Sequence, residues 1–218
     1  MLVFLDMELT SLHKGASPIS LGMVNENGKE FYAEFWDFDR RDVSHWVSEN
    51  IIPRLRYLED IVLERRICVF DGQRDTKSVY DEEKRSQELS RAGLVEVVGD
   101  KYFVKMLVVE WLKQFEKPIQ LVGDVAHYDM VLFLDLFGHA ADLPQFISPC
   151  IHDINQDIAR YLSVSDREAF DVDRIGFATK DDTDVSTRKA LRDTTHNALL
   201  DAKVIRLCYL RCTEVLQC

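Results

Sequence analysis

The chain has 218 residues, 46% of them hydrophobic and 30% charged, which is an ordinary composition for a globular protein with a sizeable core. Its net charge of −11 argues against broad electrostatic attachment to DNA, RNA or anionic membranes, whereas a short stretch or an end of a nucleic acid could still be held through metals and local cations. No apolar run could span a bilayer and no basic segment precedes the first apolar run, so we expect a cytoplasmic protein without a membrane partner.

The start of the chain combines a predicted strand with two acids. Residues 1–5 form an apolar run that predicts a buried strand, and Asp6 and Glu8 follow it. Because strand side chains alternate between faces, both carboxylates should point to one side while Leu5 and Met7 point to the other. Two like charges at an apolar strand end lose hydration and repel each other, so they need a cation or a proton. A divalent metal such as Mg²⁺ answers that need, and an edge strand with solvated acids is the alternative.

Two further strands are expected at residues 19–24 and 30–36. The chain between them contains Asn27-Gly28, a strong hairpin signal, so a three-stranded antiparallel meander is predicted to open the chain. Ser44 is then expected to cap a short helix that continues to residue 50.

The middle of the chain is strongly charged. We expect a short helix at residues 60–67, followed at residues 71–91 by a solvated helix or a partly mobile insertion. A small strand pair turning at Gly99 and Asp100 is predicted within residues 93–102. The whole chain is expected to form one α/β domain, residues 1–218, with the charged insertion around residues 71–102.

The second half of the chain alternates helical and extended patterns. An apolar strand is expected at residues 119–122, and residues 163–189 are expected to be polar and irregular. Helices are predicted at residues 103–115, 126–137, 151–162 and 196–216.

Two more acids occur where their surroundings are informative. Asp129 falls in the first turn of a predicted helix, where the helix dipole alone would favour an acid, so metal binding and helix stabilisation are both open for it. Asp124, at the preceding strand end, would either assist the site or cap that helix. Asp201 lies within an otherwise apolar helical segment, and such a position is costly for an acid unless it is paired or bound to a metal.

A histidine precedes Asp201 by five residues. In a regular helix His196 and Asp201 would lie about 140° apart, so we expect His196 at or just before the helix start, with Thr194 or Thr195 as the cap. The alternative for His196 is a surface or capping histidine.

The order of these motifs resembles a known family. Asp6-x-Glu8-x-Thr10, then Asp129, then His196-x-Ala198-x-x-Asp201 resembles the DnaQ-type 3′→5′ exonucleases of the DEDDh class, in particular their small exoribonuclease branch from bacteria and phages. The resemblance implies a ribonuclease H-like fold, in which a mixed sheet of three antiparallel strands leading into parallel strands is flanked by helices. The chain departs from the family at Ser11, where glycine is usual. It also departs before the second acid, where the family usually has Asn-Ala and this chain has the run Val125-Ala-His-Tyr. Both positions tend to contact the terminal nucleotide.

The same resemblance implies roles for individual residues. Two Mg²⁺ or Mn²⁺ ions, roughly 3.5–4 Å apart, would be held by the four acids, and His196 would be the general base. Backbone groups around Thr10 would bind the terminal 3′-OH, and Leu12 would pack on the last base. The expected partner is the single-stranded 3′ end of RNA or DNA, with RNA favoured by the branch. The expected metal ligands are Asp6, Glu8, Asp129 and Asp201.

One reading from another class stays open, an inactive ribonuclease H-like module that binds a protein partner through its acidic surface and residues 71–91. The complete set of acids argues against it, because a catalytic site that is no longer active should lose some of its metal ligands. A homodimer is also open, since Trp36 or Trp46 could lie at an interface, although a core position is expected for both.

Overall fold

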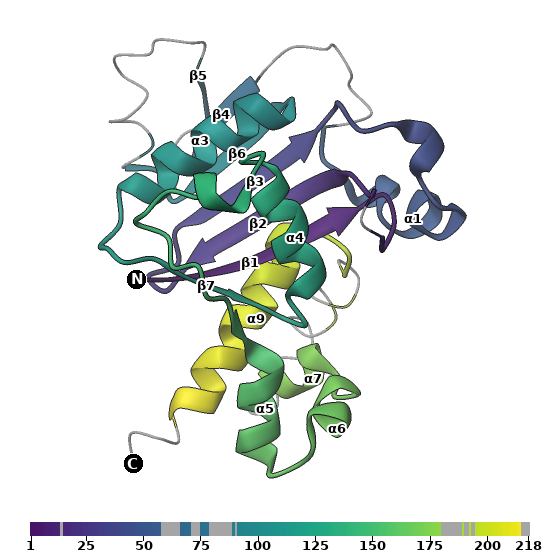
Figure 1. Cartoon of the computed structure of the whole chain (residues 1–218), viewed down its shortest axis with the longest axis vertical. Coiled ribbons are helices and arrows are strands. Elements are labelled where there is room, and N and C mark those ends of the chain that lie inside the picture. The colour runs from purple at the N-terminus through teal and green to yellow at the C-terminus, as the bar shows by residue number, and fades with distance from the viewer. Residues whose placement is uncertain are drawn as a thin grey trace.

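The computed structural model describes residues 1–13, 15–57, 66–70, 75–78, 89, 91–179, 189, 192 and 195–214. It shows an α/β architecture in which helices cover a mixed sheet (Figure 1). The strand order across the sheet is β5-β4-β6-β3-β2-β1-β7-β8. The strands are β1 (Leu2–Leu9), β2 (Pro18–Asn25), β3 (Glu30–Phe35), β4 (Arg66–Phe70), β5 (Asp75–Ser78), β6 (Leu94–Gly99), β7 (Gln120–Gly123) and β8 (His152–Asp153).

The centre of the sheet follows the predicted pattern. Strands β1, β2 and β3 form an antiparallel meander, and Gly28 at its tight turn has a φ of +82°, which favours glycine. On its other side β1 pairs in parallel with β7, and β7 pairs in parallel with β8. The prediction of three antiparallel strands leading into parallel ones is therefore confirmed.

The sheet also extends beyond β3, where several predictions were wrong. Strand β6 pairs in parallel with β3 and antiparallel with β4, which in turn pairs antiparallel with β5. The strand pair expected within residues 93–102 is thus the single strand β6, because Asp100 caps the following helix instead of forming a turn. Residues 66 and 67, expected to be helical, lie in β4, and residues 75–78 form β5. The rest of the expected helix at residues 60–67 and most of residues 71–91 lie outside the described residues.

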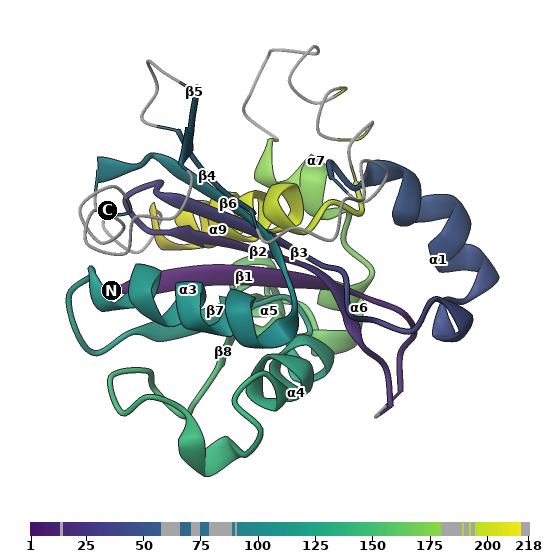
Figure 2. The same cartoon turned by 90° about the horizontal axis from the view of Figure 1, so that it is seen from above.

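Helices cover both faces of the sheet. Figure 2 shows α3 and α4 on one side and α9 on the other. The helices are α1 (His45–Asn50), α3 (Lys101–Lys113), α4 (His127–Asp135), α5 (Ile154–Leu162), α6 (Asp166–Phe170), α7 (Arg174–Ala178) and α9 (Ala198–Glu214), with 3₁₀ turns at Arg40–Asp42, Ile52–Arg54 and Ala140–Asp142. Helices α6 and α7 correct the expectation of irregular structure for the first part of residues 163–189, and residues 180–188 lie outside the described residues. The missed signal for α6 was a capping box formed by Ser165 and Glu168.

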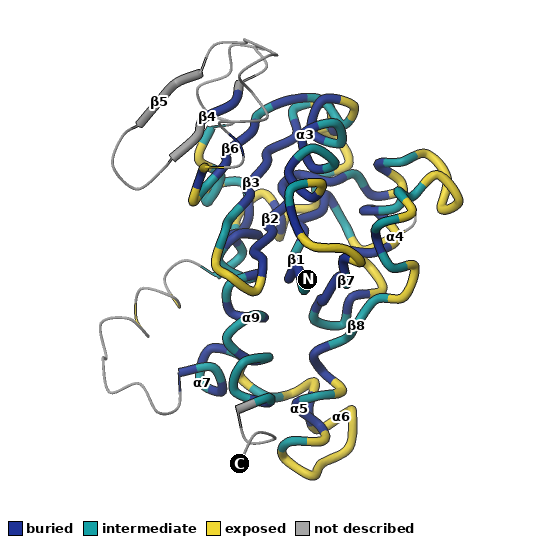
Figure 3. Tube along the Cα trace, turned by 90° about the vertical axis from the view of Figure 1, so that its left-hand side faces the viewer, coloured by how far each residue is buried: buried dark blue, intermediate teal, exposed yellow. Residues whose placement is uncertain are grey.

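Alternation along β1 divides the core. Leu5 and Met7 belong to the cluster under α3 and α4, whereas Phe4 packs with residues of α5, α7 and α9. Asp6 and Glu8 alternate with Leu5 and Met7, so both acids point to the α9 face, as predicted from strand periodicity. Figure 3 shows how consistently the central strands are buried.

Helix α9 lies in close contact with the sheet at Gly22. A Cβ atom on Gly22 would lie 2.2 Å from backbone atoms of Ala198 and Leu199, so glycine is required for this approach. Gly22 is the register partner of Asp6 on β1. The contact therefore brings the first turn of α9 directly beside Asp6.

None of the helices in the described part of the chain combines the length and the apolar character that crossing a bilayer requires.

Candidate functional site

Four acids from three distant segments lie together at one end of β1. Asp6 and Glu8 belong to β1, Asp129 to the first turn of α4, and Asp201 to the first turn of α9. Burial raises the pKa of Asp6 well above its usual value, and the charges of Asp129, Asp201 and Glu8 raise it further. The site thus gathers every acid that the motifs singled out as a metal ligand.

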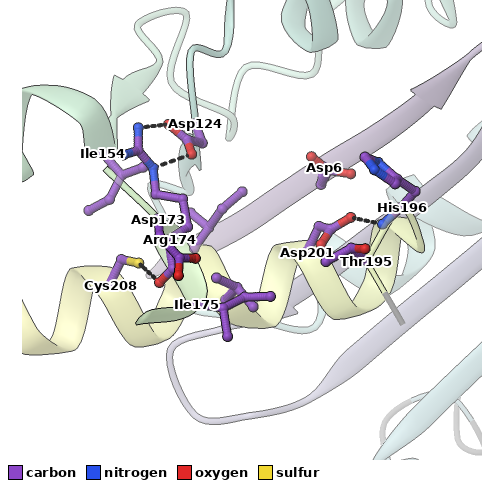
Figure 4. Close-up of a pocket in the computed structure, with 12 residues that line it drawn as sticks. Asp6, Asp124, Ile154, Asp173, Arg174, Ile175, Thr195, His196, Asp201 and Cys208 are labelled. Carbon is purple, nitrogen blue, oxygen red and sulfur yellow. Dashed lines mark hydrogen bonds and ion pairs between the residues drawn. The ribbon is translucent and has the colours of Figure 1, made fainter. Parts of the chain in front are cut away.

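His196 sits just before α9, and an unusual backbone conformation sets its geometry. Its φ of +67° is left-handed, and its backbone N–H donates to Oδ2 of Asp201 at 2.9 Å. This turn folds the chain back, so the imidazole stays near Asp201 although a regular helix would separate the two residues. Ligand atoms of Glu8, His196 and Asp201 all lie within 4.8 Å of one another. Figure 4 shows His196 and Asp201 facing Asp6.

The cap of α9 differs from the prediction. Oδ1 of Asn197 accepts the backbone N–H of Leu200 at 3.4 Å, so Asn197 takes the role expected of Thr194 or Thr195. The Thr195 hydroxyl instead donates to the carbonyl of Arg192, and Thr194 lies outside the described residues. An asparagine immediately before an apolar helix was a local signal that could have identified this cap.

The surroundings of the four acids disfavour their ionised forms. Glu8 and Asp129 are buried, and Asp6 and Asp201 are half-buried. The net pKa of Glu8 is about 8, raised by burial and by the charges of Asp201 and Asp129, and burial is the main cause that raises the net pKa of Asp129 to about 7 and of Asp201 to about 6. Arg54 opposes these increases for Glu8 and Asp201, as do backbone N–H groups for Asp129 and Asp201. The raised pKa values mean that ionisation of these acids is unfavourable without added positive charge.

The imidazole of His196 is suited to remain neutral. Burial and the nearby charge of Arg54 both lower the pKa of His196 below its usual value.

The Trp46 ring meets the imidazole edge to face, with centroids 5.0 Å apart. Trp46 is 52% exposed, so the expected core position for this residue was wrong. Trp36 is half-buried at the end of β3.

Asp124 has a partner of its own. Its carboxylate forms two hydrogen bonds with Arg174, from Nε at 2.6 Å and from Nη2 at 2.8 Å. Arg174 also donates to Oδ1 of Asn155 and to the carbonyls of Ala169 and Val172. Helix α4 is capped at Ala126 without a side-chain hydrogen bond, so Asp124 does not cap it.

The two predicted substrate contacts lie in different environments. Thr10 is fully buried, and its hydroxyl accepts the Ser17 N–H at 3.0 Å. Its backbone N–H donates to the Ser17 carbonyl, and its carbonyl accepts the Ser44 N–H. Thr10 thus closes its loop and joins it to α1, so its own backbone groups have partners within the protein. Leu12 is 68% exposed and open to a ligand.

A pocket of about 370 Å³ begins at Asp6 and Asp201. Asp6, His196 and Asp201 line one end, and the Asp124–Arg174 pair lies toward the other (Figure 4). Arg54 and Arg174 were both missed by sequence reasoning. Local sequence gives no signal for either, because their partners at the site are distant in the chain.

A comparison with models of known protein families finds no match, and a search of curated proteins finds no significantly similar sequence. The features that bear on function are therefore the motif resemblance and the geometry of the site.

Proposed function

We propose that this protein is a metal-dependent 3′→5′ exonuclease with a ribonuclease H-like fold, and that it acts on single-stranded 3′ ends with RNA preferred over DNA. The observation that carries the proposal is the convergence of Asp6, Glu8, Asp129 and Asp201 beside His196. The strand order supports the fold assignment, because an antiparallel meander continues through β1 into parallel β7 and β8.

The donor set fits hard divalent cations. Carboxylate oxygens are the ligands that Mg²⁺ and Mn²⁺ prefer, and burial has already raised the pKa of all four acids. Asp6, Glu8, Asp129 and Asp201 would hold the ions. When bound, a pair of such ions would lower the pKa of a coordinated water and stabilise negative charge on the phosphate and on the leaving oxygen.

His196 would accept the proton of the attacking water on an imidazole nitrogen. Its lowered pKa keeps that nitrogen unprotonated near neutral pH, and its left-handed turn holds the ring beside Asp201. The water oxygen bonds to phosphorus, the bond from phosphorus to the 3′ oxygen breaks, and that oxygen takes up a proton. The product is a mononucleotide, and the shortened strand ends in a new 3′-OH.

The surface charge limits the kind of substrate. A net charge of −11 disfavours long contacts with a phosphate backbone, so binding should concentrate on the last few nucleotides. Exposed Leu12 would pack on the terminal base. The preference for RNA depends on the resemblance to the exoribonuclease branch.

Hydrolysis of a 5′-labelled single-stranded RNA tests the proposal. With Mg²⁺ or Mn²⁺ we expect a ladder that shortens from the 3′ end, release of mononucleotides, loss of both with a chelator, and slower hydrolysis of the matched DNA. An RNA with a blocked 3′ end is the control and should resist. Absence of hydrolysis with either metal, together with absence of Mn²⁺ binding, would instead favour the inactive binding module.

A further inference from the structure

The turn that precedes Asp129 holds a residue in a strained backbone conformation. Val125, in the turn between β7 and α4, has a φ of +50°, which is strained for a β-branched residue. Gly123 makes the turn tight, since a Cβ atom there would lie 2.6 Å from the Cβ of Ala126. Helix α4 then begins without a side-chain cap. Such a turn needs support from elsewhere in the structure.

Asp153, at the end of β8, supplies part of that support. Its Oδ1 accepts the Val125 N–H at 3.2 Å, and its Oδ2 accepts the Ala126 N–H at 3.3 Å. Oδ1 also accepts the N–H of Asn155 at 2.9 Å, so the same carboxylate caps α5. These three bonds need two acceptor oxygens, which aspartate has and asparagine or serine lacks.

The other side of the turn is held by Arg174. Its guanidinium bonds to both carboxylate oxygens of Asp124, and its remaining bonds tie it to Asn155 and to the carbonyls of Ala169 and Val172. Val125 therefore lies between the Asp124–Arg174 ion pair and Asp153, and both are held by further hydrogen bonds. Asp153 is the anchor that binds the strained backbone directly.

We propose that Asp153 is a positioning residue, which holds Val125 in its left-handed conformation and thereby keeps Asp129 within reach of Asp6 and Glu8. The inference rests on the proposed function, because it concerns the metal site that Asp129 would complete. Without the carboxylate, Val125 can relax toward ordinary backbone angles, and the first turn of α4 moves with it. Outer partners that orient metal ligands commonly change metal affinity by about 10–100-fold.

The variant Asp153→Ser separates the two tasks of this carboxylate. Serine keeps an oxygen that can cap α5 but has none left for the turn. We expect a roughly 10-fold or greater rise in the Mn²⁺ dissociation constant measured by calorimetry, and a similar rise in the Mg²⁺ concentration for half-maximal RNA hydrolysis. The second variant Asp153→Asn keeps an oxygen for the N–H groups of Val125 and Asn155 but loses the acceptor for the Ala126 N–H, so we expect a smaller rise in the Mn²⁺ dissociation constant.

Rescue distinguishes positioning from general support of the fold. Glycine adopts positive φ at no steric cost, so adding Val125→Gly to Asp153→Ser should restore most of the Mn²⁺ affinity. The matched control is Asp100→Ser, which changes the cap of α3 where Asp100 accepts the Phe103 N–H at 2.9 Å. This control should leave the Mn²⁺ affinity unchanged.

The outcomes are distinct. Wild-type Mn²⁺ affinity and Mg²⁺ dependence in both Asp153 variants would overturn the inference while leaving the proposed function in place. A loss that Val125→Gly does not rescue would overturn it as well, because the effect would then be general support of the fold. A wild-type protein that neither binds Mn²⁺ nor hydrolyses RNA would overturn the proposed function, and this inference with it.

Discussion

Replacing His196 by asparagine will lower the rate of RNA hydrolysis by about 10²–10⁴-fold and leave Mn²⁺ binding intact. Asparagine tolerates the left-handed backbone at this position, so the N–H bond to Asp201 should survive the substitution. What the variant loses is the neutral imidazole that would accept the proton of water. Single-turnover hydrolysis of labelled RNA and calorimetric Mn²⁺ titration measure the two properties separately.

A matched pair of variants completes this experiment. Asp6→Asn removes a proposed ligand and should abolish both Mn²⁺ binding and hydrolysis, whereas His139→Asn changes a histidine at an exposed 3₁₀ turn and should alter neither. Undiminished hydrolysis by the His196 variant would refute the general-base role. Loss of Mn²⁺ binding would instead identify His196 as a ligand, an arrangement that its proximity to Glu8 and Asp201 permits.

In the absence of divalent ions, the free energy of unfolding will fall as pH rises from about 6.5 to about 8.5. The folded-state pKa of Glu8 is raised to about 8 and that of Asp129 to about 7, so the folded protein binds more protons than the unfolded chain over this range. Stability therefore declines as these acids ionise, and their contribution is lost once pH passes their folded-state pKa values. His196 acts in the opposite direction, because its lowered pKa costs stability only as pH falls through its unfolded value.

Divalent ions should reverse this decline. Mg²⁺ or Mn²⁺ binds the ionised acids of the folded protein, so the stabilisation by metal should grow with pH. Urea unfolding at about pH 6.5 and about pH 8.5, with and without metal, measures the effect, which should be on the order of a few kcal/mol. A stability that rises with pH in metal-free buffer, or that Mn²⁺ leaves unchanged, would contradict the account.

Features encoded over short distances were predictable from the sequence. Alternation along β1 placed Asp6 and Glu8 on one face without knowledge of any partner strand, and Asn27-Gly28 located the turn between β2 and β3. The angular argument for His196 placed it before α9, where the structure has it. Each of these inferences needs only a few neighbouring residues.

Features that depend on distant partners were not predictable. Strand β6 resembled half of a hairpin, but its partners are β3 and β4, and strand pairing over such separations leaves no local pattern. The ion pair of Asp124 with Arg174 spans 50 residues. Trp46 was expected in the core, yet Val47 is the one buried residue of the short helix α1. Its neighbour Trp46 therefore faces solvent and His196.

The most direct measurement of the central claim is a crystal structure of the protein soaked in Mn²⁺, with the ions located by anomalous scattering. We expect two peaks beside the carboxylates of Asp6, Glu8, Asp129 and Asp201, near the His196 imidazole. A map without peaks there, or with its peaks bound only at other acids of the surface, would contradict it.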